Sequence, residues 1–465
     1  MPPNARDRRS DRMAFIGAYD IRGRFPSDIG PYEIDHLAAA FARLGTGPML
    51  VGRDVRKESA KVEQLLVRGL RVRGRSVIAL GVQPTPAVGF AAARFGCTAL
   101  ALTPSHNRLG YVGIKGFCSS GKQFSREWEK VRRLYRQSVQ STRPALPGRK
   151  RPSPHPRRAL LEHGWIESYL EHVTQNLSSS LSIVTDARGG AAAQVAPRAL
   201  RKMGARVVAL HSRFSPDFYG LSPEPTRGNV RGLARTVRAE RADFGVTFDA
   251  DGDRAAFVDE RGRWTEPEVI ATLFYRYLSP SSQPLVATVD ASYRCEEIVP
   301  TVRSRVGARF VEATMGRSGA VVGFEGSGHY YLRRWGPNSD GVLVSCVLAN
   351  LLERTGKSLS VVADEFGPIY RENRSIDFDS RVEAARAYQS IRRRFSGSGA
   401  SRTVDGLAVQ LPSGRMLVRL SNTQPTVRVT LESAERRRVR ELGLEFEAAF
   451  ERLRSKMKSL RISER

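Results

Sequence analysis

Strand-like and helix-like segments alternate along much of this chain. Apolar runs at 49–52, 76–80 and 98–102 are typical of buried strands, and the stretches 58–73 and 85–95 between them carry apolar residues at helical spacing. A chain that alternates in this way builds a sheet with helices packed on its faces. The alternation therefore predicts an α/β fold.

The alternation occurs three times. The second set has expected strands at 182–185, 206–210 and 244–248. The third set runs from about Glu266 to Glu353. Its expected elements are strands at 285–289 and 308–311, a turn at 314–317 and a helix from about Asp340.

The last ninety or so residues have a different pattern. A helix is expected at 382–395, then three strands, then a charged helix from about Glu435, which is an α+β arrangement. The sequence thus predicts three similar mixed α/β sheet domains followed by a C-terminal α+β domain. The expected bounds are 1–150, 151–262, 263–372 and 373–465, with a linker rich in Pro, Arg and Ser at 141–158.

Composition limits the functional classes. The chain has 465 residues, a formal net charge of +28 and a pI of about 10.8, but its arginines are spread over nearly every segment. We therefore expect no specific nucleic-acid site, although the charge suits phosphorylated partners. Four widely spaced cysteines indicate reduced thiols in a cytoplasmic protein, and no apolar run is long enough for a membrane span.

A short polar motif follows the strand at 98–102. Its residues are Thr103, Pro104, Ser105, His106 and Asn107. Ser105 could be a nucleophile or a phosphate carrier, and His106 a proton donor or base. Lys115, farther along, is a cation that could meet phosphate. By itself, however, the motif is more typical of an ordinary turn than of a catalytic loop.

Three aspartates occupy every second position of a short segment that lies between two apolar strands. Asp249, Asp251 and Asp253 can converge on one side of an extended loop, and oxygen ligands of this kind suit Mg²⁺. Arg254, which follows them, could meet a phosphoryl oxygen. A solvated acidic turn is the alternative, whereas an EF-hand is excluded because strands rather than helices are expected on both sides of the loop.

Two further loops carry polar groups. The glycine-rich loop 323–329 presents Glu325, Ser327 and His329, which could contact sugar hydroxyls or phosphate. The segment 419–428 combines two arginines with hydroxyl and amide groups and could cradle a phosphate. Surface turns are the alternative for both loops.

In this order the motifs resemble those of the α-D-phosphohexomutase superfamily. The resemblance is carried by six motifs that span nearly the whole chain, at 19–23, 52–54, 103–107 with Gly113 and Lys115, 249–254, 325–329 and 419–425. It implies four domains around a central active-site cleft, with at least one motif in each domain.

The resemblance also implies a role for each matched residue. Ser105 would carry the phosphoryl group, and Asp249, Asp251 and Asp253 would hold Mg²⁺ together with it. The residues implied in proton transfer and charge stabilisation are His106, Lys115, Arg22, Arg254 and His329. Those implied in substrate binding are Tyr19, Glu325, Ser327, Arg419, Ser421, Asn422, Thr423 and Arg428.

The implied activity is the interconversion of hexose 1-phosphate and hexose 6-phosphate, with mannose or glucose as the sugar. A hexose 1,6-bisphosphate would be the activator, and the protein would be a monomer or homodimer. The alternatives are a phosphoglucosamine mutase, a weakly active relative that binds sugar phosphates or polyanions, and a metal-dependent phosphatase. This chain departs from the family pattern at Arg108, Val112, Arg317 and Gln424.

Overall fold

The computed structural model describes residues 15–17, 19–45, 47–141, 164–395, 400–411, 414–421, 425–454 and 461–464. The expected linker at 141–158 lies outside these residues except for Ser141. The chain forms two compact units, Met1–Glu266 with Ser327–Ser360, and Pro267–Gly326 with Val361–Arg465.

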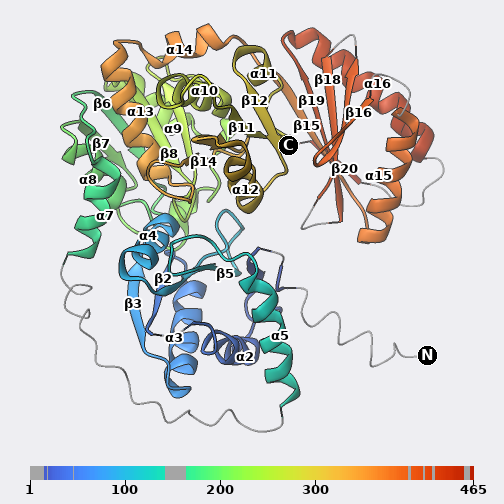
Figure 1. Cartoon of the computed structure of the whole chain (residues 1–465). Coiled ribbons are helices and arrows are strands. Elements are labelled where there is room, and N and C mark those ends of the chain that lie inside the picture. The colour runs from blue at the N-terminus through green and yellow to red at the C-terminus, as the bar shows by residue number, and fades with distance from the viewer. Residues whose placement is uncertain are drawn as a thin grey trace, which may run out of the picture. The chain divides into compact units, whose positions relative to one another are not determined.

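The first sheet has five strands in the order β1-β5-β4-β2-β3, of which β5, β2 and β3 are labelled in Figure 1. Three of these strands are parallel, and β5 and β1 extend the sheet in antiparallel fashion. Helices α2, α3 and α5 share one core with the sheet, while α4 contacts β2 and β4 outside that core. The elements are β1 (Ile21–Arg24), α2 (Pro31–Phe41), β2 (Met49–Arg53), α3 (Lys57–Val72), β3 (Val77–Val82), α4 (Thr85–Phe95), β4 (Thr98–Leu102), β5 (Tyr111–Phe117) and α5 (Glu127–Gln140).

The second sheet repeats this pattern in the order β10-β9-β8-β6-β7. Again three strands are parallel and two antiparallel strands extend one edge. Helix α9 packs on one face, and α7, α8 and α13 contact one another. The elements are α7 (Trp165–Thr174), β6 (Ser182–Asp186), α8 (Val195–Lys202), β7 (Arg206–Leu210), η1 (Phe218–Gly220), η2 (Arg227–Asn229), α9 (Arg231–Ala239), β8 (Phe244–Phe248), β9 (Ala255–Asp259), β10 (Trp264–Thr265) and α13 (Gly341–Thr355). The short strand β14 (Tyr330–Leu332) lies in the same unit but is not a strand of this sheet.

In the second unit, β11 pairs in parallel with β12 on one side and with β13 on the other. The strand expected at 308–311 and the turn expected at 314–317 are wrong, because both belong to helix α12. Val311, Thr314 and Met315 are buried at helical spacing, and the helix ends where Gly319 takes a φ of 73°. The elements are α10 (Pro267–Leu278), β11 (Leu285–Thr288), α11 (Arg294–Ile298), β12 (Thr301–Ser304), α12 (Ala308–Ser318), β13 (Val322–Phe324) and α14 (Leu359–Phe366).

The fourth sheet is antiparallel, with the order β16-β17-β18-β19-β15-β20. Helices α15 and α16 share a core with it, which confirms the predicted α+β arrangement. The elements are β15 (Tyr370–Asp377), α15 (Arg381–Phe395), β16 (Ala400–Thr403), β17 (Gly406–Leu411), β18 (Gly414–Leu420), β19 (Thr426–Ser433), α16 (Arg436–Arg454) and β20 (Arg461–Glu464).

Three motif-bearing loops leave equivalent strands. In each of the first three sheets a central strand, β2, β6 or β11, has two parallel neighbours. The neighbour that comes later in the chain is β4, β8 or β13. The loops that follow these three strands carry Ser105, the three aspartates and Glu325. One topology therefore presents three different sets of functional groups.

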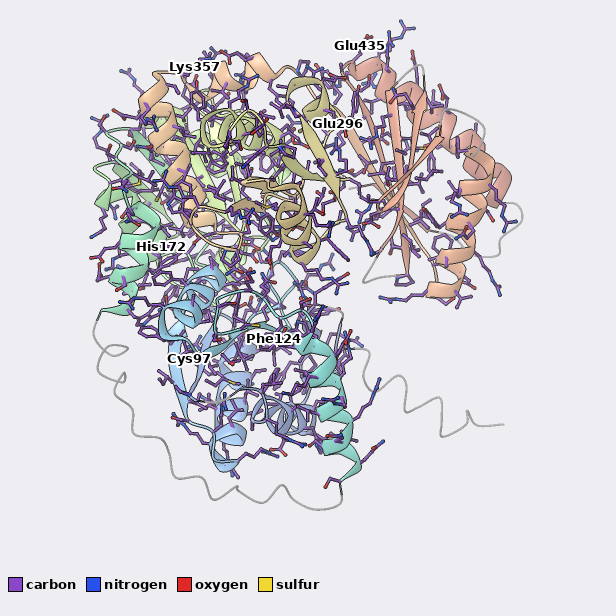
Figure 2. All side chains as sticks on the ribbon, in the orientation of Figure 1. Cys97, Phe124, His172, Glu296, Lys357 and Glu435 are labelled. Atoms are coloured by element: carbon purple, nitrogen blue, oxygen red, sulfur yellow. The ribbon has the colours of Figure 1, made fainter. Side chains whose placement is uncertain are left out.

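The four cysteines are free thiols, and Cys97 is buried near the end of α4 in the first sheet domain, where Figure 2 labels it together with the core residue Phe124.

Among the described residues, none of the helices has both the length and the apolar character that crossing a membrane requires.

A buried acid at the start of α13 makes stability depend on pH. Asp340 accepts hydrogen bonds from the backbone N–H groups of Val342 and Leu343 and from the Tyr169 hydroxyl at 2.8 Å. Burial raises the pKa of Asp340 from 3.8 to about 6. The folded state thus favours the protonated acid, and this contribution to stability is full below pH ~4 and lost as the pH rises through ~6.

Replacing Asp340 with asparagine removes this titration and keeps a side chain that can cap the helix. From pH 4 to pH 7 we expect the free energy of unfolding of the wild type, relative to Asp340→Asn, to fall by up to about 3 kcal/mol. Urea unfolding of both proteins across this range measures the difference. A difference that stays constant with pH would contradict the prediction.

Candidate active site

The loop between β4 and β5 holds Ser105 in a constrained conformation. Ser105 has a φ of 54°, in the left-handed region that residues other than glycine rarely adopt, and it is 2% exposed. Its backbone N–H donates to Thr103 Oγ1 at 2.9 Å. Gly113 in β5 lies directly beneath the loop, since a Cβ added there would approach Thr103 O to 2.4 Å. The loop therefore rests closely on its own sheet.

The loop between β8 and β9 brings three carboxylates together. Asp249, Asp251 and Asp253 are all buried, and each offers an oxygen within 4.8 Å of the others. Gly341, at the start of α13, packs against this loop, because a Cβ there would approach Arg254 O to 2.5 Å. The acidic loop is thus a packed part of the structure, which disfavours the alternative of a solvated turn.

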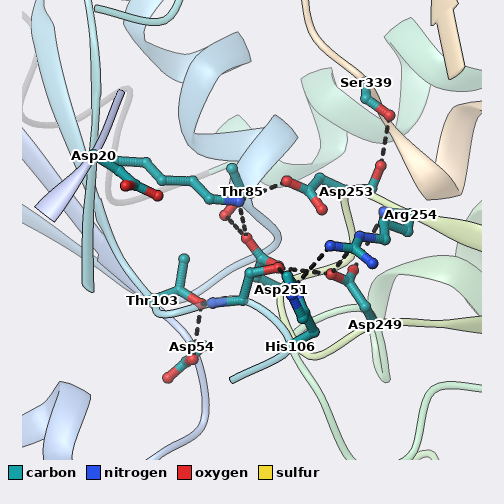
Figure 3. A network of polar contacts seen from close by, with 12 residues as sticks. Asp20, Asp54, Thr85, Thr103, His106, Asp249, Asp251, Asp253, Arg254 and Ser339 are labelled. Atoms are coloured by element: carbon teal, nitrogen blue, oxygen red, sulfur yellow. Dashed lines mark hydrogen bonds and ion pairs between the residues drawn. The ribbon is translucent and has the colours of Figure 1, made fainter. Parts of the chain in front are cut away.

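The two loops meet within the first unit, as Figure 3 shows for their polar contacts. Ser105 Oγ donates a hydrogen bond to Asp249 Oδ2 at 2.9 Å. Thr85, at the start of α4, binds Asp251 through its backbone N–H at 2.8 Å and through its hydroxyl at 2.5 Å. The serine and the acidic cluster therefore form one site.

Lys115 reaches into this cluster from β5. Its Nζ lies 2.7 Å from Asp251 Oδ2 and 2.6 Å from Asp253 Oδ2. Burial alone would lower the pKa of Lys115, but the two aspartates raise it above its ordinary value. Burial would likewise raise the pKa of Asp253, yet Lys115 and His329 hold it well below its usual range. Burial, with repulsion from Asp251 and Asp253, raises the pKa of Asp249 well above its usual range.

Arg254 and His106 lie beside the serine. Arg254 Nη2 is 2.7 Å from His106 Nδ1, and Nη1 donates to Glu224 at 3.1 Å. The charge of Arg254, together with burial and Arg22, lowers the pKa of His106 well below its usual range. The imidazole is therefore neutral, with Nδ1 as acceptor.

Arg22 and His329 complete the group in the first unit. Arg22 donates to Asp20 at 2.6 Å and to the Asn107 side chain at 3.0 Å, and the half-buried Tyr19 precedes Asp20. His329 Nε2 lies 3.3 Å from Asp253 Oδ1, and its Nδ1 lies 2.9 Å from Ser327 Oγ. All the residues expected to take part in proton transfer and charge stabilisation thus surround one site.

The second unit carries residues expected to bind the sugar and the phosphate. They lie in the loop after β13, and on β18, β19 and the segment between them. Glu325 is 4% exposed and accepts from the Gly307 N–H at 3.0 Å. Arg419 donates to Asp405 at 2.7 Å and faces Arg428 across the β18–β19 ladder. The Ser421 N–H donates to Thr426 O. Asn422, Thr423 and Gln424 lie outside the described residues.

The acidic cluster fits a divalent cation. Its donor set consists of carboxylate oxygens, which Mg²⁺ prefers. Asp251 Oδ1 and Asp253 Oδ1 are both buried, and Asp251 Oδ1 has no hydrogen bond in the described structure, so it has a lone pair available to a metal ion. Lys115 already binds the other oxygen of each carboxylate.

Four contributors to the site were not predicted: Asp54, Arg56, Thr85 and Ser339. The Ser339 hydroxyl donates to Asp253 O at 2.6 Å, and the others support the serine loop or Asp251. Among these, only Asp54 lies in a motif, Gly52-Arg53-Asp54, and that motif gave no indication of which atoms it would contact.

Models of the phosphoglucomutase/phosphomannomutase family match nearly the whole chain. The α/β/α domains I, II and III match residues 13–140, 165–262 and 266–370, and the C-terminal domain matches 376–449. These matches, with the four sheets, confirm the predicted four-domain α/β architecture. The bounds predicted for the four domains stay predictions.

Similar proteins carry mutase names. A protein from Methanopyrus kandleri named "Probable phosphoglucosamine mutase" is 33% identical over 449 residues, covering 93% of this chain and 96% of its own. A phosphoglucomutase/phosphomannomutase family protein from Burkholderia thailandensis has a similar fold, with a TM-score of 0.79, 24% identity and coverage of 94% and 97%. An Aspergillus fumigatus N-acetylphosphoglucosamine mutase, solved with GlcNAc-6P and magnesium, gives a TM-score of 0.54 at 14% identity, covering 88% and 78%.

Proposed function

This chain belongs to the α-D-phosphohexomutase superfamily, and we propose that it is a phosphoglucosamine mutase that works through a phosphoserine at Ser105. The observation that carries the proposal is the hydrogen bond from Ser105 Oγ to Asp249 Oδ2, which joins the serine to a buried triad of carboxylates. An intramolecular phosphotransferase needs a nucleophile beside groups that offset phosphoryl charge, and this site provides both.

The reaction consists of two phosphoryl transfers. In the first, the phosphoryl group leaves phosphorylated Ser105 for the free hydroxyl at carbon 6 of a sugar 1-phosphate, so that the P–Oγ bond breaks and a P–O6 bond forms. The hydroxyl proton passes to a residue of the site. In the second transfer, the P–O1 bond of the bisphosphate breaks and a P–Oγ bond to Ser105 forms. O1 takes up the proton held by the site, and a sugar 6-phosphate is released.

Asp249, Asp251 and Asp253 would hold Mg²⁺, and its positive charge would offset the negative charge of the phosphoryl oxygens. Arg254, 3.6 Å from Asp249 at Nε, supplies a fixed positive charge to the same region, and Arg22 supplies another beside Asn107. Lys115 and His329 are the candidate proton-transfer residues, because both lie next to Asp253.

The rest of the substrate would be bound by the other loops. Glu325 and Ser327 are proposed to bind sugar hydroxyls, and Tyr19 to contact the substrate near Arg22. The phosphate that is not reacting is assigned to donors of the segment 419–428, which are Arg419 on β18, Ser421, Asn422, Thr423 and Arg428 on β19.

A substrate panel tests this proposal. The Methanopyrus kandleri relative is named a probable phosphoglucosamine mutase, and this name is the reason to expect glucosamine phosphate as the substrate. We expect glucosamine 1-phosphate to have a kcat/KM at least about 10-fold above that of mannose or glucose 1-phosphate. A coupled assay with Mg²⁺ and a trace of hexose 1,6-bisphosphate measures all three. A preference for mannose or glucose would support the second candidate, a phosphomannomutase/phosphoglucomutase. Release of inorganic phosphate without isomerised sugar would contradict both.

A further inference from the structure

The segment after β2 contains a buried ion pair that is not part of the reaction as described so far. The side chains of Asp54 and Arg56 are both 0% exposed, and Arg56 Nη1 contacts Asp54 Oδ2. The Arg56 N–H also donates to Asp54 Oδ1 at 3.1 Å. Removing the two charges of such an ion pair from water is costly. The hydrogen bonds that the pair makes to other groups therefore indicate what it stabilises.

Arg56 binds the backbone of the serine loop. Its Nη2 donates to Ser105 O at 2.8 Å and to Asn107 O at 2.6 Å, so one nitrogen holds the carbonyls on either side of His106. These contacts join residues about 50 positions apart in the chain. A planar guanidinium suits this task because its donors have fixed directions.

Asp54 binds the same loop through Thr103. Asp54 Oδ2 accepts from the Thr103 hydroxyl at 2.9 Å, and Thr103 Oγ1 in turn accepts from the Ser105 N–H at 2.9 Å. Both backbone polar groups of Ser105 are therefore tied to the ion pair, the carbonyl directly and the N–H through Thr103.

The ion pair is covered from the second sheet domain. The Arg56 guanidinium lies 4.9 Å from the ring centroid of Phe218, which is 1% exposed. Val55, Phe218 and Ala250 form a small apolar cluster at this point. Because water is excluded, the bonds of Arg56 to the loop are stronger than exposed ones would be.

We propose that Asp54 and Arg56 are positioning residues that hold Ser105 in its left-handed backbone conformation and so direct Oγ toward the aspartates. A non-glycine residue at a φ of 54° persists only where its surroundings favour it, and these bonds supply that constraint. The kinetic part of this inference rests on the proposed mutase function. Neither residue is assigned a contact with substrate, so their loss should lower kcat and leave KM nearly unchanged.

The test is Arg56→Lys, which keeps a positive charge for Asp54 but cannot reproduce the directed donors to the two carbonyls. We expect kcat to fall about 10- to 100-fold and KM to change by less than about 2-fold. The rate at which hexose 1,6-bisphosphate phosphorylates Ser105, followed by intact mass, should fall by the same factor as kcat.

Arg75→Lys is the matched control. Arg75 also donates to two backbone carbonyls, those of Leu44 and Gly45 at 2.9 Å, but it lies before the amino ends of β2 and β3, away from the serine loop. Its variant should keep the kcat and the phosphorylation rate of the wild type.

Thr103→Val gives a second test if Arg56→Lys does not fold. It removes only the hydroxyl between Asp54 and the Ser105 N–H, and kcat should again fall with KM unchanged. Wild-type kcat in a folded Arg56→Lys protein, or a rise in KM at constant kcat, would overturn the inference and leave the mutase function intact. A wild-type protein that turns over no hexose phosphate would overturn both.

Discussion

Replacing Ser105 with alanine is expected to abolish the mutase reaction, with kcat reduced on the order of 10⁴-fold or more. The reason is that the variant has no atom to carry the phosphoryl group, whereas the remaining charges of the site can still bind substrate. The coupled assay with glucosamine 1-phosphate measures kcat. Intact mass after incubation with hexose 1,6-bisphosphate measures the phosphate on the protein, which should be present on the wild type and absent from Ser105→Ala.

Ser138→Ala is a matched control for this experiment. Ser138 lies on α5 of the same sheet domain, where its hydroxyl contacts His36 Nδ1 at 2.7 Å, remote in sequence from both site loops. This variant should keep its turnover and its phosphate. If Ser105→Ala retained wild-type turnover, or took up the same phosphate, Ser105 would not be the carrier.

The second large effect is expected for Asp251→Asn. Asp251 accepts from Thr85, pairs with Lys115 and has its Oδ1 free of hydrogen bonds, so the amide would disturb both the ion pair and a proposed metal ligand. We expect kcat to fall on the order of 10³-fold. Mg²⁺ should also raise the melting temperature of the wild type, by mass action on the folded state, and this rise should shrink or vanish in the variant.

Asp259→Asn separates metal binding from general stability. Asp259 is 1% exposed at the end of β9 and pairs with Arg263, so the variant loses a buried carboxylate that is not part of the cluster. It should melt at a lower temperature but keep the full rise with Mg²⁺. An Asp251→Asn protein whose melting temperature rises with Mg²⁺ as much as the wild type would rule out Asp251 as a ligand.

Strands and helices with a clear apolar period could be predicted from the sequence. The predicted bounds of β4, β7, β8 and α4 coincide with those observed, because each apolar run ends at a polar residue or a glycine. Helix α12 was missed because its first residues, Ala308–Val311, are an apolar patch too short to separate a strand from a helix. Its periodicity is visible only when Thr314 and Met315 are counted as buried.

The site was predictable to the extent that its residues lie in motifs. Ser105 and the three aspartates stand out in the chain, and the structure brings them into contact. Arg56 and Thr85 could not be found in this way, because each acts through a partner more than 45 positions away and the pairing depends on how β2, α4 and the acidic loop are arranged in space. Similarly, the double ion pair of Lys115 depends on tertiary structure alone.

The equivalent origin of the three motif-bearing loops, after β4, β8 and β13, has a consequence for how this protein can change. Each loop begins at a strand whose hydrogen bonds to its parallel neighbour are already complete. Side chains can therefore be exchanged in one loop without changing the strand order of any sheet. Evolution, or a protein engineer, can thus alter the phosphoryl carrier, the cation ligands or the sugar contacts one at a time, on a scaffold that stays the same.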